Sequence, residues 1–238
     1  MIPFEADQFA DVFPASDNDN GMAPGDAVLH LRLVGRMKAW TLGGDSVLPV
    51  GRKTRALLAV VALAAPRAAL RGRLVELLWS RRQEEQARAS LRQEIYRLRD
   101  TLAPAGAGIL AVTRDHLILR PGAAWVDVTQ VMRASVARPM ALSLLEGKLL
   151  EDLDGLDPNF DLWLATERER LRDHARCLAE SLLRGLADPD AAIPAAQRLL
   201  RIDRAHEGAW RALMRARAER GERGMAIQAY DRCRTVLA

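Results

Sequence analysis

Residues 52–65 place the strongest constraint on the fold of this chain. Their sequence, RKTRALLAVVALAA, has a helix-forming composition, and after the first turn apolar side chains lie on nearly every side. Pro66 follows and ends the helix, because proline cannot supply the backbone N–H of a further turn. A helix without a polar face has to be covered on all sides. We therefore predict a buried central helix against which other elements pack.

A second helix, predicted over residues 84–102, has an amphipathic pattern. Its apolar side chains recur at spacings of four, four, three and four, so they form one stripe and leave a polar face opposite. A shorter amphipathic helix over residues 71–79 precedes it, and the polar segment SRRQ separates the two. The stripe of the long helix consists of Ala87, Leu91, Ile95, Leu98 and Leu102.

Short apolar runs on either side of these helices predict strands. Three antiparallel strands are expected at residues 29–33, 39–42 and 47–50. The runs at 109–112 and 117–119 flank a polar turn and predict a closing hairpin. The order of strands, helix, short helix, long helix and hairpin is that of a winged helix-turn-helix domain.

Composition divides the chain into three parts. Residues 1–27 contain Pro, Gly, Asn and Asp without an apolar period, and we predict that they form a disordered acidic tail. Residues 28–136 form the predicted α+β winged helix-turn-helix domain. Residues 137–238 are rich in Leu and Ala without a strand pattern, so an all-α helical domain is expected there.

The net charge of +4 is distributed unevenly over these parts. Residues 1–27 have a net charge of −6, whereas residues 28–138 hold 19 basic and 8 acidic residues and have a net charge of +11. The remaining residues have a net charge of −1. A basic segment of domain size indicates a polyanionic partner, although many exposed arginines on a solvated surface would give the same balance.

Several other classes of protein are disfavoured by the sequence. The four histidines lack metal-ligand spacing, and no phosphate-binding loop or catalytic triad motif is present, so neither an enzyme nor a cofactor is expected. Cys177 and Cys233 lie on apolar helix faces and are predicted to be buried thiols rather than a disulfide framework. No membrane span or secretory signal is predicted, which favours the cytoplasm.

The end of the chain has the spacing of a helical repeat. Comparison with the segment 34 residues earlier aligns Ala226 with Ala192, and 34 residues is the period of a tetratricopeptide repeat. The earlier copy is degenerate, so we expect these side chains to pack helix against helix, as we do for Trp163. The residues that match the repeat pattern are Trp210, Leu213, Gly221, Ala226, Tyr230 and Cys233.

Four strings in the sequence carry a resemblance to a known family. LPVGRKTRALLAVVALA, LVELLW and ARASLRQEIYRLRDTL resemble the OmpR-type DNA-binding domain of antibiotic regulatory protein (SARP) transcriptional activators. LLEGKLLEDLDGLDPNFDLWLATERERLR resembles the bacterial transcriptional activator domain that follows it in that family. The resemblance implies double-stranded DNA as a partner. It also implies contact with RNA polymerase and a homodimer on repeated half-sites.

The helix at 84–102 is the predicted recognition helix, because a helix and a turn precede it and its polar face is basic. Arginine can bind guanine through two hydrogen bonds, and glutamine can pair with adenine. The base-edge candidates are Gln86, Arg88, Arg92 and Gln93. Phosphate candidates further along the helix are Tyr96, Arg97 and Arg99, and Arg114 in the hairpin turn is the wing candidate.

Two further basic clusters are phosphate candidates. Arg52, Lys53 and Arg55 lie where the N-terminus of the central helix can receive a phosphate through backbone amides. Arg81 and Arg82 lie in the turn before the recognition helix.

Other interpretations of these residues stay open at this point. The basic face can be a solvated surface with intrahelical pairs, such as Arg88 with Glu84 and Arg92 with Glu85. The whole chain can be a protein-interaction scaffold that has lost DNA binding, or the regulatory front half of a larger signalling protein that continues past Ala238.

Removing residues 1–27 should leave the melting temperature nearly unchanged and strengthen DNA binding. The segment offers no buried apolar pattern, and its charge of −6 repels DNA. Thermal melts and DNA titrations of the shortened and full chains test this. A large drop in melting temperature would show instead that the segment packs on a domain.

Overall fold

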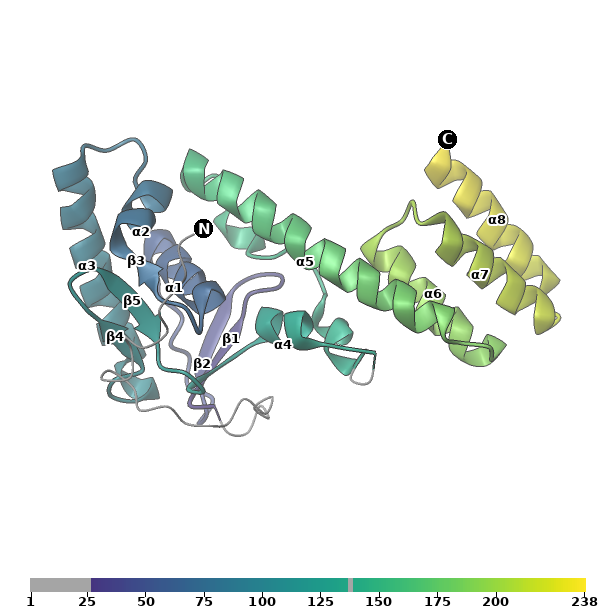
Figure 1. The fold of residues 1–238 in the computed structure, drawn as a ribbon, viewed down its shortest axis with the longest axis horizontal. Coiled ribbons are helices and arrows are strands. Elements are labelled where there is room, and N and C mark those ends of the chain that lie inside the picture. The colour runs from purple at the N-terminus through teal and green to yellow at the C-terminus, as the bar shows by residue number, and fades with distance from the viewer. Residues whose placement is uncertain (1–26, 137–138) are drawn as a thin grey trace, which may run out of the picture. The chain divides into compact units, whose positions relative to one another are not determined.

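The computed structural model describes residues 27–136 and 139–238 (Figure 1). They form two compact units, each described by itself below. The N-terminal unit contains the described residues up to Gln130 together with Leu144–Glu167, and the C-terminal unit contains the described part of Val131–Ser143 together with Arg168–Ala238. Of the predicted acidic tail, only Ala27 is described, and Ala27 is buried. The rest of the tail lies outside the described residues.

The N-terminal unit combines two small sheets with helices. One sheet has the strand order β2-β1-β6, and the other has the order β3-β5-β4. The strands are β1 (Leu29–Arg32), β2 (Lys38–Thr41), β3 (Ala69–Leu70), β4 (Leu110–Val112), β5 (His116–Leu119) and β6 (Ala124–Val126). The helices are α1 (Arg52–Ala64), α2 (Arg71–Leu78), α3 (Glu84–Leu102) and the first parts of α4 (Asp127–Arg133) and α5 (Pro158–Arg184).

The prediction of a third N-terminal antiparallel strand at 47–50 was wrong. In that segment Val47 donates its backbone N–H to Ala39 at 3.0 Å, but Pro49 has no N–H with which to continue a ladder. The second neighbour of β1 is β6, which pairs with it in parallel. The paired residues, such as Leu31 and Val126, are 95 positions apart in the chain. β1 and β2 pair antiparallel as expected.

The predicted central helix is confirmed as α1. Its side chains from Ala56 to Ala62 are all buried, and α2, α3 and β5 pack around it (Figure 1). The predicted closing hairpin is also confirmed, because β4 and β5 pair antiparallel with Leu110 opposite Leu119. The N-terminal unit therefore has the element order and the core of a winged helix.

Residues 144–157 add a strap to the N-terminal unit, although composition placed them in the second domain. Gly35 donates to the carbonyl of Lys148, and Leu150 donates to the carbonyl of Leu33, both at 2.7 Å. A short 3-10 helix, Glu151–Leu153, follows. The domain boundaries expected from composition stay a prediction, and the packing adds that a segment beyond residue 136 is part of the N-terminal unit.

Asp127 ties β1 to the junction between β6 and α4. Its carboxylate, which is 1% exposed, accepts hydrogen bonds from the backbone N–H groups of Leu33, Val34 and Val128 at 2.8–3.0 Å. Burial raises the pKa of the Asp127 carboxyl, and the three backbone donors oppose that rise. One side chain thus satisfies three buried donors at the end of β1.

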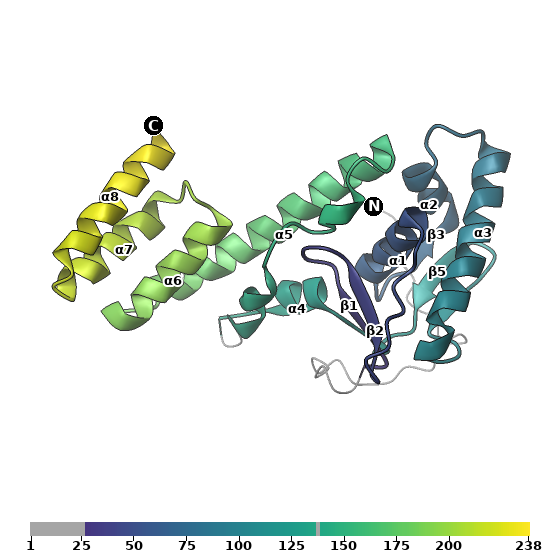
Figure 2. The ribbon, with the colours of Figure 1, turned by 180° about the vertical axis from the view of Figure 1, so that it is seen from behind.

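Helices make up the C-terminal unit. The later part of α5, α6 (Pro189–Ile202), α7 (Glu207–Glu219) and α8 (Arg223–Leu237) are joined by short connections, and α6, α7 and α8 pack side by side in sequence order (Figure 2). Trp210, Leu213 and Ala229 are buried between them. This is the all-helical arrangement that the sequence predicted.

Three expectations in the helical region were wrong in detail. Tyr230 is 54% exposed, because it lies on a face of α8 that α7 does not cover, and Ala229 is the buried residue of that helix. Cys177 is exposed and Cys233 is half-buried, so the thiols are not core residues. Trp163 is half-buried and packs against Phe160, with ring centroids 5.3 Å apart.

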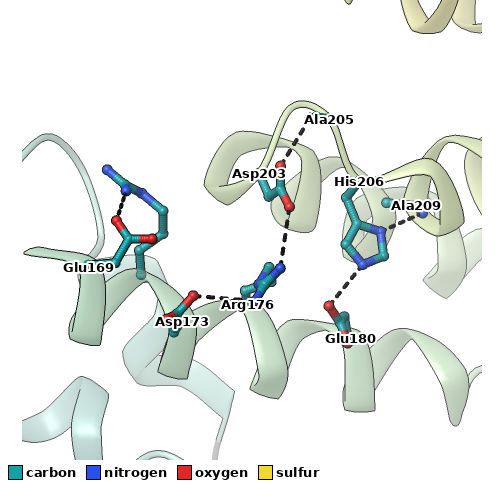
Figure 3. Close-up of polar contacts among 9 residues, drawn as sticks. Glu169, Asp173, Arg176, Glu180, Asp203, Ala205, His206 and Ala209 are labelled. Carbon is teal, nitrogen blue, oxygen red and sulfur yellow. Dashed lines mark hydrogen bonds and ion pairs between the residues drawn. The ribbon is translucent and has the colours of Figure 1, made fainter. Parts of the chain in front are cut away.

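Charged side chains hold α5 against the loop between α6 and α7 (Figure 3). Arg176 on α5 lies between Asp173 at 3.3 Å and Asp203 at 3.9 Å. His206 caps α7 by accepting from the N–H of Ala209 at 3.0 Å, and its other ring nitrogen lies 2.9 Å from Glu180 on α5. His206 therefore links the start of one helix to the side of another.

The substitution Asp127→Ala should destabilise the protein strongly. Each buried donor that loses its acceptor costs about 1–3 kcal/mol, and this change leaves three. Urea unfolding measures the loss, with Asp100→Ala at the exposed surface of α3 as a matched control. Equal stability of the two variants would contradict the role assigned to Asp127.

Candidate nucleic-acid interface

α2 and α3 form a helix-turn-helix, with residues 79–83 as the turn. The predicted apolar stripe of α3 is confirmed as its buried face, since its five residues are at most 5% exposed. That face packs on α1 and α2, which leaves the opposite face of α3 at the surface (Figure 1). The buried stripe therefore fixes which side chains of α3 point to solvent.

All seven candidate residues of α3 are exposed. Within the described part of the chain, the side chains of Arg92 and Gln93 make no hydrogen bond or ion pair. Arg88 pairs with Glu84, one turn earlier, which is one of the two intrahelical pairs considered from the sequence. The other pair, Arg92 with Glu85, is not formed. The exposed set is Gln86, Arg88, Arg92, Gln93, Tyr96, Arg97 and Arg99.

A buried polar contact orients α3 on α1. Thr54, which is 2% exposed, donates its hydroxyl to the carboxylate of Glu94, which is 9% exposed. Glu94 also forms an ion pair with Arg97 at 2.8 Å. Glu94 was not recognised in the sequence, because it sits between Gln93 and Ile95 in a polar stretch and its partner Thr54 lies 40 residues earlier.

The turn before α3 carries Arg81 and Arg82, and both are exposed. Arg82 donates to the hydroxyl of Ser90 at 2.8 Å, so its guanidinium lies along the start of α3. The preceding residue, Ser80, donates its backbone N–H and its hydroxyl to Asp157 at 3.1 and 2.6 Å. The contact with Ser90 places Arg82 beside α3, and both arginines lie at the surface in the turn before it.

The hairpin turn between β4 and β5 presents Arg114, which is exposed. The Thr113 hydroxyl accepts from the N–H groups of Asp115 and His116 at 3.3 and 3.2 Å and thereby shapes the turn. Arg71 at the start of α2 donates its guanidinium to the Thr113 carbonyl at 3.1 Å and its backbone N–H to the Asp115 carbonyl at 2.8 Å. Sequence reasoning missed Arg71, whose role depends on a segment about 40 residues away.

The three basic residues at the start of α1 are engaged with the N-terminal unit itself. Arg52 donates to the carbonyl of Asp154 at 2.6 Å, and Arg55 pairs with Asp152 at 3.1 Å. Lys53 donates to the carbonyl of Leu78 and lies 3.7 Å from Asp157.

Burial lowers the pKa of the Lys53 amine, and the charge of Asp157 opposes that shift. The Lys53 nitrogen also lies 5.4 Å from the ring centre of Trp79. Arg52, Lys53 and Arg55 therefore contact the strap and not the exposed face of α3. Their role in phosphate binding stays a prediction.

Neither a metal site nor a membrane-spanning helix is found in the described residues. Within 27–136 and 139–238, no group of three or more His, Cys, Asp or Glu side chains is placed to hold a metal ion. Over the same residues, no helix has the length and apolarity needed to cross a membrane.

An exposed recognition-type helix and a wing, followed by packed helices, define a winged-helix protein with a helical second part. The family described as bacterial transcriptional activator domain matches residues 119–238. This match covers half of the chain, and the chain belongs to that family. The family is one of transcriptional regulators, and the resemblance to SARP activators is confirmed.

Two known proteins are similar to this chain. The regulatory protein AfsR of Streptomyces coelicolor is 28% identical over 244 residues, which cover 95% of this chain and 23% of AfsR. The chain thus spans about a quarter of the length of that relative. The structure of EmbR from Mycobacterium tuberculosis, in complex with a low-affinity phosphopeptide, is similar with a TM-score of 0.65. It is 22% identical, and the similarity covers 89% of this chain and 60% of EmbR.

Thr54→Val should destabilise the fold by about 1–3 kcal/mol, because it leaves the buried Glu94 without its hydroxyl donor while keeping the shape of the side chain. Thr101→Val on α3 is the matched control, since that hydroxyl donates to the Arg97 carbonyl of the same helix. Chemical denaturation of both variants is the measurement. If Thr54→Val costs no more than Thr101→Val, the contact does not hold α3 on α1.

Proposed function

We propose that the chain is a sequence-specific regulator that binds double-stranded DNA and activates transcription at promoters. The observation that carries the proposal is the exposed face of α3, whose arginines and glutamines lie opposite a fully buried stripe. An α-helix fits the major groove of B-form DNA, and these side chain types match the hydrogen-bonding edges of guanine and adenine. The net charge of +11 over residues 28–138 supports the same conclusion.

The side chains near the start of α3 are proposed to read bases. Arg92 and Gln93 are exposed and unpaired within the described residues, so both can bind base edges without losing an internal contact. Arg88 has to exchange its pair with Glu84 for a base or a phosphate. Gln86, one turn before Ser90, completes the proposed set of base-reading residues.

Phosphate contacts are proposed on both sides of that set. Arg81 and Arg82 stand before α3, and Tyr96, Arg97 and Arg99 stand in its second half. Arg97 is held by Glu94, which restricts the positions its guanidinium can reach. Arg114 in the wing is proposed to reach the minor groove or its phosphates, with Arg71 holding the turn in place.

The remaining parts of the proposal rest on family membership. The helical domain is proposed to support dimerisation on repeated half-sites or to contact RNA polymerase, and a cytoplasmic location is proposed because transcription is regulated there. No catalysis is assigned to this part of the chain. AfsR and EmbR both extend beyond the region that this chain matches, so their whole activities are not transferred.

Arg92→Ala should weaken binding to a duplex selected from a random pool by about 1–3 kcal/mol and relax the preference at one base position. Arg114→Ala should weaken the binding of selected and random duplexes about equally, because phosphate contacts carry no sequence information. Fluorescence titration with both duplexes measures the two patterns.

Arg223→Ala is the control for the loss of one positive charge, since Arg223 is an exposed residue of α8. Circular dichroism should show that all three variants fold, because none of the three side chains is buried. An unchanged ratio of selected to random affinity in Arg92→Ala would mean that α3 does not read bases through Arg92.

A further inference from the structure

The C-terminal unit contains an open groove that plays no part in the proposed DNA interface. It has a volume of about 750 Å³ and is lined by α6, α7 and α8. Its floor is apolar: Leu200 of α6, Trp210 and Leu213 of α7 and Ala229 of α8 are each at most 9% exposed. The indole N–H of Trp210 donates to the carbonyl of Arg204 at 2.8 Å, so the ring is fixed in position.

The rim of the groove is strongly basic. Four arginines and one aspartate line it, which gives the lining a net charge of +3. Arg217 is neutralised by Glu222 at 3.0 Å. The other three arginines are exposed, and within the described residues their side chains have no hydrogen-bond or ion-pair partner. They are Arg201, Arg204 and Arg232.

Apolar side chains stand among these arginines. Met225 is 44% exposed and Val236 is 42% exposed, and both belong to the face of α8 that lines the groove. Arg232 lies between them in sequence, one turn before Val236. The groove therefore has an apolar floor, exposed apolar side chains on α8 and positive charge on both sides.

We infer that this groove binds an acidic amphipathic peptide segment of another protein. Apolar side chains of such a segment would pack on the floor, and its carboxylates would pair with Arg201, Arg204 and Arg232. Aromatic residues and arginines are also the residue types that dominate binding energy at protein interfaces. The inference does not rest on the proposed DNA binding.

The chemistry of the groove disfavours a nucleic acid as the occupant. Single-stranded nucleic acids bind by stacking bases on accessible aromatic faces. Trp210 is only 7% exposed, and the other floor residues are aliphatic. A basic peptide is disfavoured by the unpaired arginines.

Fluorescence anisotropy with a labelled synthetic peptide of about 15 residues tests the inference on the full chain. In this peptide Leu and Phe recur at helical spacing, and Asp and Glu occupy most other positions. A second peptide has Lys at every acidic position. The acidic peptide should bind and the basic one should not, and the double variant Arg204→Glu/Arg232→Glu should lower the affinity at least about tenfold.

The matched control is Arg223→Glu/Arg234→Glu, which changes the net charge equally at two exposed positions of α8 outside the groove lining. Its affinity for the acidic peptide should fall less than about threefold. All four substituted residues are exposed, and circular dichroism checks that both variants fold.

Three outcomes of these titrations would overturn the inference: no binding of the acidic peptide, equal binding of the two peptides, or equal losses in the two double variants. A fourth comes from a shortened chain. A chain that begins at Ala27 is also titrated. If it binds the acidic peptide more than about tenfold more tightly, the occupant is the chain's own acidic segment and not another protein.

Discussion

The complete burial of α1 from Ala56 to Ala62 is the constraint on which the N-terminal unit depends. From Ala56 to Ala62 the helix has no solvent-exposed side chain, so α2, α3 and β5 have to cover it from different directions. Only its first turn is polar, and that turn holds the strap through Arg52, Lys53 and Arg55. The helix-turn-helix and the wing thus obtain their relative positions from one apolar helix.

Two buried carboxylates restrict the positions in which these apolar surfaces can pack. Apolar contact alone permits a helix to slide or rotate, whereas a carboxylate needs particular donors. Glu94 receives the Thr54 hydroxyl and so defines how α3 lies on α1. Asp127 receives three backbone N–H groups and defines where β1 ends. The exposed face of α3 follows from these contacts as much as from its apolar stripe.

Local sequence patterns predicted α1, α2, α3 and the β4–β5 hairpin nearly to the residue, because apolar period, proline and turn composition act over short distances. They did not predict the parallel pairing of β1 with β6 or the strap at 144–157, because both join segments about 90 to 120 residues apart. The candidate site shows the same difference between features set by local sequence and features set by distant contacts. Exposed residues such as Arg92 follow from the helical period, whereas Glu94 and Arg71 depend on distant partners.

The central claim is that the exposed face of α3 lies in the major groove of DNA. Methylation interference tests it most directly, because dimethyl sulfate modifies guanine N7 in the major groove and adenine N3 in the minor groove. A duplex selected by the full chain is partially methylated, and bound and free strands are compared. Guanine N7 methylation within the selected site should prevent binding. Binding that is insensitive to guanine methylation, with interference only at adenine N3, would contradict it.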